Sequence, residues 1–185
     1  METMTTSIIL PFLVFFPFLG AVISYIIGRS NKGARDIWCW ILSAVIFIAS
    51  LMLIGKETVY SLRGFCGLGL SFVADGFGVI LAVLTGAIWL ITTIFSKEYM
   101  AAERNRNRYY FFVFLTLGAT MGIFLSADLF TTFIFFEIMS FTSFVLVMHD
   151  EEDFTVRSAK TYLAVAVIGG LVTLMGLFMM YQKAG

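Results

Sequence analysis

One carboxylate lies near the middle of a long apolar stretch. The run from Leu129 to Met148 contains no charged residue other than Glu137 and is long enough to span a bilayer. An ionised side chain at the bilayer centre costs on the order of 2.5–3.5 kcal/mol on insertion scales. Because such residues are typical of proton relays and cation sites, Glu137 is predicted to be a protonatable or cation-binding group, with the Ser140 hydroxyl as a hydrogen-bond partner. The alternative is a carboxylate that only hydrogen-bonds a neighbouring helix.

Lys160 and His149 are the other candidates for a proton or ion path. Lys160 lies about one turn inside a later apolar run, where it either snorkels to the headgroups or joins a relay to Glu137 through water. By helix rise, Glu137 lies about 16 Å from the cytoplasmic end of its span and Lys160 only about 5 Å in, so a direct pair is not expected. His149 precedes four acidic residues and could collect protons at a channel mouth, although a lone histidine in a solvated loop is the simpler interpretation.

The elements that must position these groups are transmembrane helices. The chain is 60% hydrophobic and 13% charged, with a mean hydropathy of +0.96, whereas soluble domains are about 25% charged. Its apolar runs are too long for barrel strands, so the predicted fold is an all-α integral membrane protein. The prediction is one transmembrane domain over residues 1–185, with six spans at residues 7–28, 37–54, 76–95, 109–126, 129–148 and 159–181.

Two aspartates stand directly before predicted spans. Asp75 precedes the third span and Asp128 the fifth, and an aspartate in that position accepts hydrogen bonds from the free N–H groups of a helix start. Both are predicted to be structural helix caps. The only long external loop, residues 55–75, mixes apolar residues with glycines around a turn and is consistent with a hairpin at the membrane interface.

The basic residues predict the orientation of the spans. Lysines and arginines concentrate in the loops that follow the first, third and fifth spans, and the positive-inside rule places such loops in the cytoplasm. The N-terminus is therefore expected outside. The residues on the proposed cytoplasmic side are Arg29, Lys32, Arg35, Lys97, Arg104, Arg106, Arg108 and Arg157, against Lys56, Arg63 and Lys183 on the other side.

Sequence motifs for soluble enzymatic chemistry are absent. Cys39 and Cys66 are far apart and form no metal or redox motif, and there is no phosphate-binding loop, dinucleotide fingerprint or Ser/His/Asp arrangement. The net charge of zero gives no indication of a nucleic-acid partner. We therefore expect no cofactor on this chain.

Three short segments match motifs of one known family. Ser71–Gly78 (SFVADGFG) resembles the segment before its third helix, and Ser158–Leu163 (SAKTYL) the start of its sixth. Phe133–Ser140 (FIFFEIMS) resembles its fifth-helix signature, whose glutamate is the key carboxylate of the proton path. The family comprises the antiporter-like subunits of respiratory complex I, the Mrp cation/proton antiporters and the membrane subunits of energy-converting hydrogenases.

The resemblance implies a specific fold, of which the six spans would be only a part. Members of this family have about fourteen helices in inverted repeats, and the six spans correspond to the start of that fold. Asp75, Glu137 and Lys160 fall on motif positions. The lysine that partners the glutamate lies on the seventh helix of family members. Either the sequence is the beginning of a longer subunit, or a further membrane subunit is expected to supply the later helices.

The expected function is proton or Na⁺/H⁺ translocation in the inner or cytoplasmic membrane, in a complex-I-like, hydrogenase or Mrp-type assembly. Any redox reaction of that assembly would take place in other subunits. Two alternatives are a non-conducting scaffold subunit, in which Glu137 is a structural hydrogen-bonding group, and a free-standing six-helix transporter.

Overall fold

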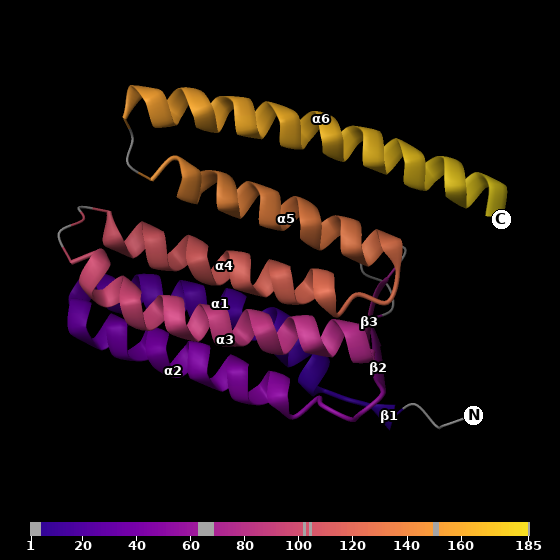
Figure 1. Ribbon diagram of the computed structural model, residues 1–185, viewed down its shortest axis with the longest axis horizontal. Helices are drawn as coiled ribbons and strands as arrows, with labels where there is room; N and C mark the ends of the chain where they lie inside the picture. The colour runs from indigo at the N-terminus through magenta and orange to yellow at the C-terminus, as the bar shows by residue number, and fades with distance from the viewer. Residues whose placement is uncertain (1–4, 63–68, 102, 104, 150–151, 185) are drawn as a thin grey trace.

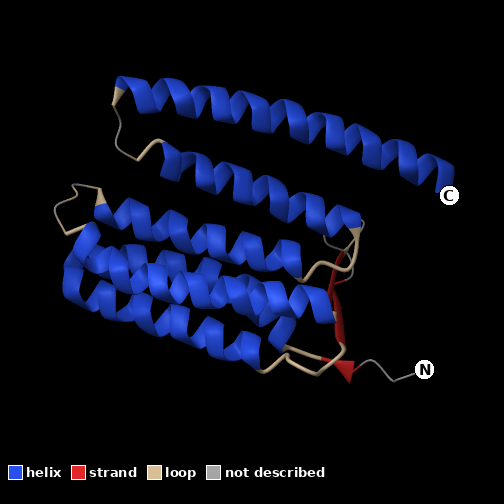
Figure 2. Ribbon diagram, viewed as in Figure 1, coloured by secondary structure: helices blue, strands red, loops and turns tan. Residues whose placement is uncertain are grey.

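The computed structural model describes residues 5–62, 69–101, 103, 105–149 and 152–184. Within these residues it contains six long helices and three short strands (Figures 1 and 2). The helices are α1 (Ile9–Ser30), α2 (Lys32–Leu51), α3 (Gly76–Tyr99), α4 (Arg106–Phe124), α5 (Leu129–Val147) and α6 (Asp153–Ala184), and the strands are β1 (Thr5–Thr6), β2 (Thr58–Leu62) and β3 (Leu70–Ala74).

The six predicted helices are present, and five of them are long and apolar enough to cross a membrane. The exception is α4, because it begins with Arg106, Asn107 and Arg108 and this polar turn lowers its apolar content. The apolar part of α4 starts at Tyr109, where the fourth span is predicted to begin. The chain is therefore a predominantly helical, multi-pass membrane protein with a small sheet at one end.

Besides α4, two helices begin earlier than the predicted spans. The side chain of Asn31 accepts hydrogen bonds of 2.9 and 3.1 Å from the first N–H groups of α2, which starts the helix at Lys32 rather than at residue 37. Arg35, assigned to a cytoplasmic loop by its charge, is instead a helical residue with no exposed surface. Similarly, α6 begins at Asp153 rather than at residue 159.

The strands form one sheet in the order β1-β2-β3. β2 and β3 are antiparallel, with Thr58 opposite Ala74 and Leu62 opposite Leu70, which confirms the hairpin within residues 55–75. Residues 63–68, between the two strands, lie outside the described residues. β1 pairs parallel to β2, so the segment before α1 is also tied to the sheet.

The helices lie side by side, and α1 packs against both α2 and α4 (Figure 1). α3 packs on α2, α5 packs on α4, and α6 packs chiefly on α5. The core is apolar and includes Leu13, Leu117 and Phe135. The links after α1, α3 and α5 gather at one end of the bundle, and the sheet and both chain ends lie at the other (Figure 1). α6 forms the outer layer, with large apolar side chains exposed along its length.

Candidate proton site between α5 and α6

Glu137 lies on the face of α5 that meets α6. Its side chain is half-buried, and its Oε1 atom is buried with no hydrogen-bond partner among the described residues. An unpaired buried carboxylate oxygen is costly, and such orphaned groups call for an explanation such as a bound proton, ion or water. The geometry therefore supplies a polar atom that can accept a proton.

The carboxylate rests against the backbone of Gly170 on α6. A Cβ atom at position 170 would lie 2.8 Å from Cδ of Glu137 and 2.9 Å from its Oε2, and it would overlap Oε1. Gly170 is buried, whereas Gly169 and Gly176 face open space. Only one glycine of α6 therefore makes room for the carboxylate, and any larger residue there would displace it.

The Ser140 hydroxyl does not pair with Glu137, so that part of the prediction is wrong. Ser140 Oγ donates instead to the carbonyl of Phe136, at 3.0 Å. A serine inside a helix commonly donates to the carbonyl four residues earlier, because that acceptor is always within reach. The intrahelical hydrogen bond leaves the carboxylate without its expected donor.

Other hydroxyl groups connect α5 to its neighbours one to two turns from Glu137. Ser143 Oγ and Tyr162 Oη are hydrogen-bonded at 2.8 Å between α5 and α6. The Thr116 hydroxyl donates to the Thr142 hydroxyl at 2.9 Å between α4 and α5. Polar groups therefore continue along α5 from the carboxylate towards the end of the bundle that carries His149.

Lys160 is exposed on α6 and lies well away from Glu137. Gly170 marks the level of Glu137 on α6, and ten residues of helix separate it from Lys160, or about 15 Å. The contact between Ser143 and Tyr162 lies between the two levels. This separation agrees with the expectation that Glu137 and Lys160 make no direct pair.

His149 is buried, with 9% of its surface exposed, so the interpretation as a solvated loop residue is wrong. Its ring packs edge-on against Tyr109 at a centroid distance of 5.8 Å, and its carbonyl accepts a 2.9 Å hydrogen bond from Arg108. The Nε2 atom is buried without a partner among the described residues. The Tyr109 hydroxyl in turn lies 2.9 Å from Ser96 Oγ. Of the acidic residues that follow His149, the first two lie outside the described residues.

Asp75 and Asp128 occupy the N-cap positions of α3 and α5. Asp75 Oδ1 accepts a 2.8 Å hydrogen bond from the N–H of Gly78. Asp128 accepts from both the N–H and the hydroxyl of Thr131, at 2.8 and 2.7 Å. Thr131 also accepts from the N–H of Ser71, so this cap joins α5 to β3. Both carboxylates are engaged in holding helix ends.

A buried ionic cluster between α2 and α4 is not apparent from the sequence. Asp36 accepts hydrogen bonds from Arg35 and Arg106, each at 2.9 Å, and Arg35 also donates to Asn107. The guanidinium of Arg35 lies over the ring of Tyr110, 4.8 Å from its centroid. In the sequence these arginines read only as loop charges. Within the described part of the chain, no group of three or more His, Cys, Asp or Glu side chains could hold a metal ion.

Residues 126–185 match the family model described as NADH:quinone oxidoreductase/Mrp antiporter, TM. The matched part contains Glu137, His149, Lys160 and Gly170. Curated relatives include the protein named "Putative antiporter subunit mnhD2" of Staphylococcus aureus, in strains JH9 and Newman, which is 28% identical over 190 residues and 98% of this chain. The chain spans 37% of the length of these relatives.

Two solved structures share the fold. One is that of the membrane-bound sulfane sulfur reductase, an archaeal respiratory membrane complex, with a TM-score of 0.85 and 16% identity over 95% of this chain and 37% of that chain. The other is the Mrp complex from Dietzia sp. DQ12-45-1b, with a TM-score of 0.81 and 21% identity over 95% of this chain and 34% of that chain. The C-terminal third of the chain therefore matches the NADH:quinone oxidoreductase/Mrp antiporter family, and the fold is similar to that of chains in an Mrp complex and a respiratory membrane complex.

Proposed function

We propose that the chain forms part of a cation/proton-translocating membrane subunit and that Glu137 is its protonatable site. The observation that carries the proposal is the buried, unpartnered Oε1 atom in the contact between α5 and α6. A carboxylate kept at that depth can release its proton when water or a cation reaches it and take one up when it is sealed from water.

The proposed path runs from Glu137 towards the end of the bundle that contains His149. The Ser143 and Tyr162 hydroxyls and the buried His149 ring provide polar groups in that direction, and water would bridge the gaps between them. Lys160, two residues from Tyr162, lies at the same end and would carry a charge beside the path. The helix ends that carry Arg29, Lys32, Lys97 and Arg157 gather at this end, which we assign to the cytoplasm (Figure 1).

We also propose that the chain works within a larger assembly in the cell membrane. Both structural neighbours are multi-subunit membrane complexes, and the chain spans about a third of their matching chains. α6 exposes large apolar side chains, among them Val165, Leu171 and Met175. Further helices packed there, from the rest of such a subunit or from a partner, would enclose Glu137 and supply the second half of the ion site, and lipid would cover what remains.

The experiment compares two substitutions of Glu137 within the intact assembly. Glu137→Gln keeps the size and hydrogen-bonding capacity of the side chain but removes the titratable group. We expect it to abolish ion-driven proton transport in membrane vesicles while the amount of assembled complex stays normal. Normal transport by this variant would refute the proposal. The scaffold alternative would gain support if, in addition, Glu137→Leu prevented assembly.

A further inference from the structure

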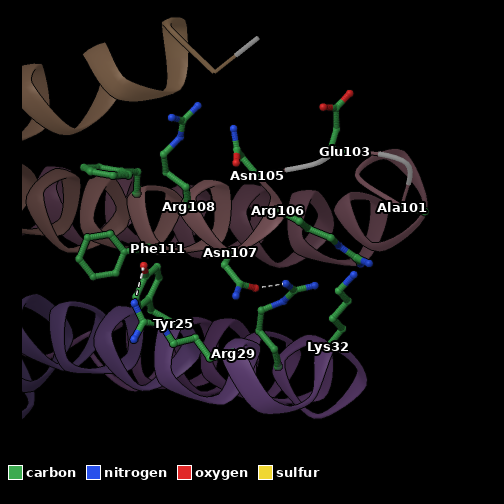
Figure 3. Close-up of a pocket in the computed structure, with 12 residues that line it drawn as sticks. Tyr25, Arg29, Lys32, Ala101, Glu103, Asn105, Arg106, Asn107, Arg108 and Phe111 are labelled. Atoms are coloured by element: carbon green, nitrogen blue, oxygen red, sulfur yellow. Dashed lines mark hydrogen bonds between the residues drawn. The ribbon is translucent and has the colours of Figure 1, made fainter. Parts of the chain in front are cut away.

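A second site lies at the end of the bundle that also carries His149, where α1 ends and α2 and α4 begin. It is a cavity of about 600 Å³. A volume of this size is typical of sites for small molecules. Its lining includes the basic residues Arg29, Lys32, Arg35, Arg106 and Arg108 (Figure 3). None of the groups assigned to proton transfer lines it.

The cavity is strongly basic. Five of its lining side chains are cationic, and Glu103 is the one carboxylate among them. Figure 3 shows the Glu103 carboxylate directed away from Arg106 and Lys32. Arg29 and Lys32 have no carboxylate partner among the described residues; Arg29 contacts only the Tyr25 ring and hydroxyl. The cavity therefore presents positive charge that the described part of the chain does not neutralise.

The floor of the cavity is rigidly built. Arg35 is fully buried and is held by Asp36 and Asn107, so its guanidinium has one position. Arg106 shares the same Asp36 carboxylate, and its Nε atom is buried without a partner among the described residues. One buried and one half-buried guanidinium group thus share a single carboxylate, and the cluster keeps an excess positive charge next to the cavity.

The start of α4 adds further partial positive charge beside the cavity. Its N-cap residue, Asn105, lines the cavity but makes no side-chain hydrogen bond to the helix. Within the described residues, the first N–H groups of α4 therefore have no side-chain cap, unlike those of α2, which Asn31 caps. Free N–H groups at a helix start, beside arginine side chains, are the groups that bind phosphate oxygens.

The position of the cavity selects a lipid as the source of the phosphate. Arg29 continues a stripe of exposed apolar residues on α1, formed by Leu19, Val22 and Ile26 at helical spacing. Aromatic side chains, Phe111 and Phe112, form part of the wall. If Arg29 and Lys32 hold the phosphate of a lipid, its acyl chains can lie along that apolar stripe. A free phosphate ion has no apolar part that could contact it. Basic pockets at the ends of membrane helices on the cytoplasmic side bind anionic headgroups.

We propose that this cavity binds the phosphate headgroup of an anionic phospholipid. Arg29 and Lys32 contact the phosphodiester from the membrane side, and Arg106 and the uncapped N–H groups of α4 contact it from the inner side. The bound lipid fixes the α1–α2 turn against the start of α4. This proposal does not depend on proton transport by Glu137.

The test measures lipid retention by the purified complete assembly. Delipidated complex is incubated with phosphatidylglycerol or with phosphatidylcholine, and native mass spectrometry counts the lipids that stay bound. We expect the double variant Arg29→Gln/Lys32→Gln to bind phosphatidylglycerol at least tenfold more weakly than the unchanged complex at this site. Both side chains are exposed, so folding should be preserved, and gel filtration checks it.

The matched control is Lys56→Gln/Lys183→Gln, which removes two exposed lysines from the other end of the bundle. It should retain phosphatidylglycerol as the unchanged complex does. The proposal would be overturned if the Arg29/Lys32 variant and the Lys56/Lys183 variant lost phosphatidylglycerol to the same extent, or if both retained it equally. Retention of phosphatidylcholine as tight as that of phosphatidylglycerol would also overturn it. A further arm adds inorganic phosphate: displacement of the lipid at millimolar concentration would identify a site for free phosphate instead of a lipid site.

Discussion

The carboxylate of Glu137 packs directly against the backbone of Gly170, and this contact joins the acidic group of α5 to α6. Neither residue has the other as a hydrogen-bond partner; the glycine contributes only space. A helix position without a side chain therefore decides where the carboxylate can lie.

This contact predicts that Gly170→Ala impairs transport without changing any titratable group. The added methyl group would overlap the carboxylate, which must then rotate or push α6 away. Transport should fall by at least about tenfold, since a displacement of about 1 Å of a reacting group can cost 100-fold. Ion-driven proton uptake in vesicles, normalised to the amount of assembled complex, gives the measurement.

Gly169→Ala is the matched control, because a Cβ atom at position 169 meets nothing within 4 Å. It changes the same helix by the same methyl group and should leave transport unchanged. If both alanine variants transported normally, the packing of Glu137 against Gly170 would not be required for transport.

His149→Phe separates proton transfer from packing at the proposed cytoplasmic end. Phenylalanine can keep the edge-on contact with Tyr109, and the hydrogen bond from Arg108 goes to the main-chain carbonyl and survives the change. We expect normal assembly and a several-fold lower transport rate, most evident at alkaline pH where protons are scarce. A variant with an unchanged rate across pH would remove His149 from the path.

Asp36→Asn should destabilise the bundle. The Asp36 carboxylate is the shared partner of Arg35 and Arg106, and both arginines would keep a positive charge with nothing opposite it. Removal of one member of a buried ion pair costs about 3–5 kcal/mol. Thermal unfolding of the purified assembly should begin at a clearly lower temperature than in the unchanged protein. The exposed Glu98→Gln serves as control and should not shift unfolding; an equal shift in both variants would contradict the assignment.

The cap of α5 gives a smaller effect of predictable sign. Asp128→Ala removes the acceptor for the N–H and hydroxyl of Thr131 and should cost about 1 kcal/mol. Asp128→Asn keeps a capping oxygen, so its loss of unfolding free energy should be only roughly a few tenths of a kcal/mol. Thermal unfolding of the two variants side by side checks the order, and a larger loss for asparagine than for alanine would show that charge, not capping, is the main contribution.

Much of the fold could be predicted from the sequence because it follows from local properties. The apolar runs fix the number of helices, and aspartate before a run indicates where α3 and α5 begin. The start of α2 differs from the prediction because the charges of Lys32 and Arg35 suggest a loop, whereas the Asn31 side chain caps a helix there. The pairing of Thr5 and Thr6 with β2 depends on tertiary contact and leaves no local signal.

The candidate site could be predicted only in part, for a related reason. The depth of Glu137 follows from its position in the run, but its partner on α6 depends on how two helices rotate against each other. Three glycines of α6 are equivalent in the sequence, and only the folded bundle distinguishes Gly170. Ser140 lies three residues after Glu137, on the same side of the helix, yet its hydroxyl donates to the nearer main-chain carbonyl of Phe136.

The central claim is that Glu137 takes up and releases a proton. The most direct measurement is the infrared difference spectrum of the membrane-embedded assembly after a change of pH, which records the carbonyl stretch of protonated carboxyl groups. We predict a carboxyl band that appears on acidification in the unchanged protein and is missing from Glu137→Gln, while Gly169→Ala retains it. The same band in both the unchanged protein and Glu137→Gln would contradict the account.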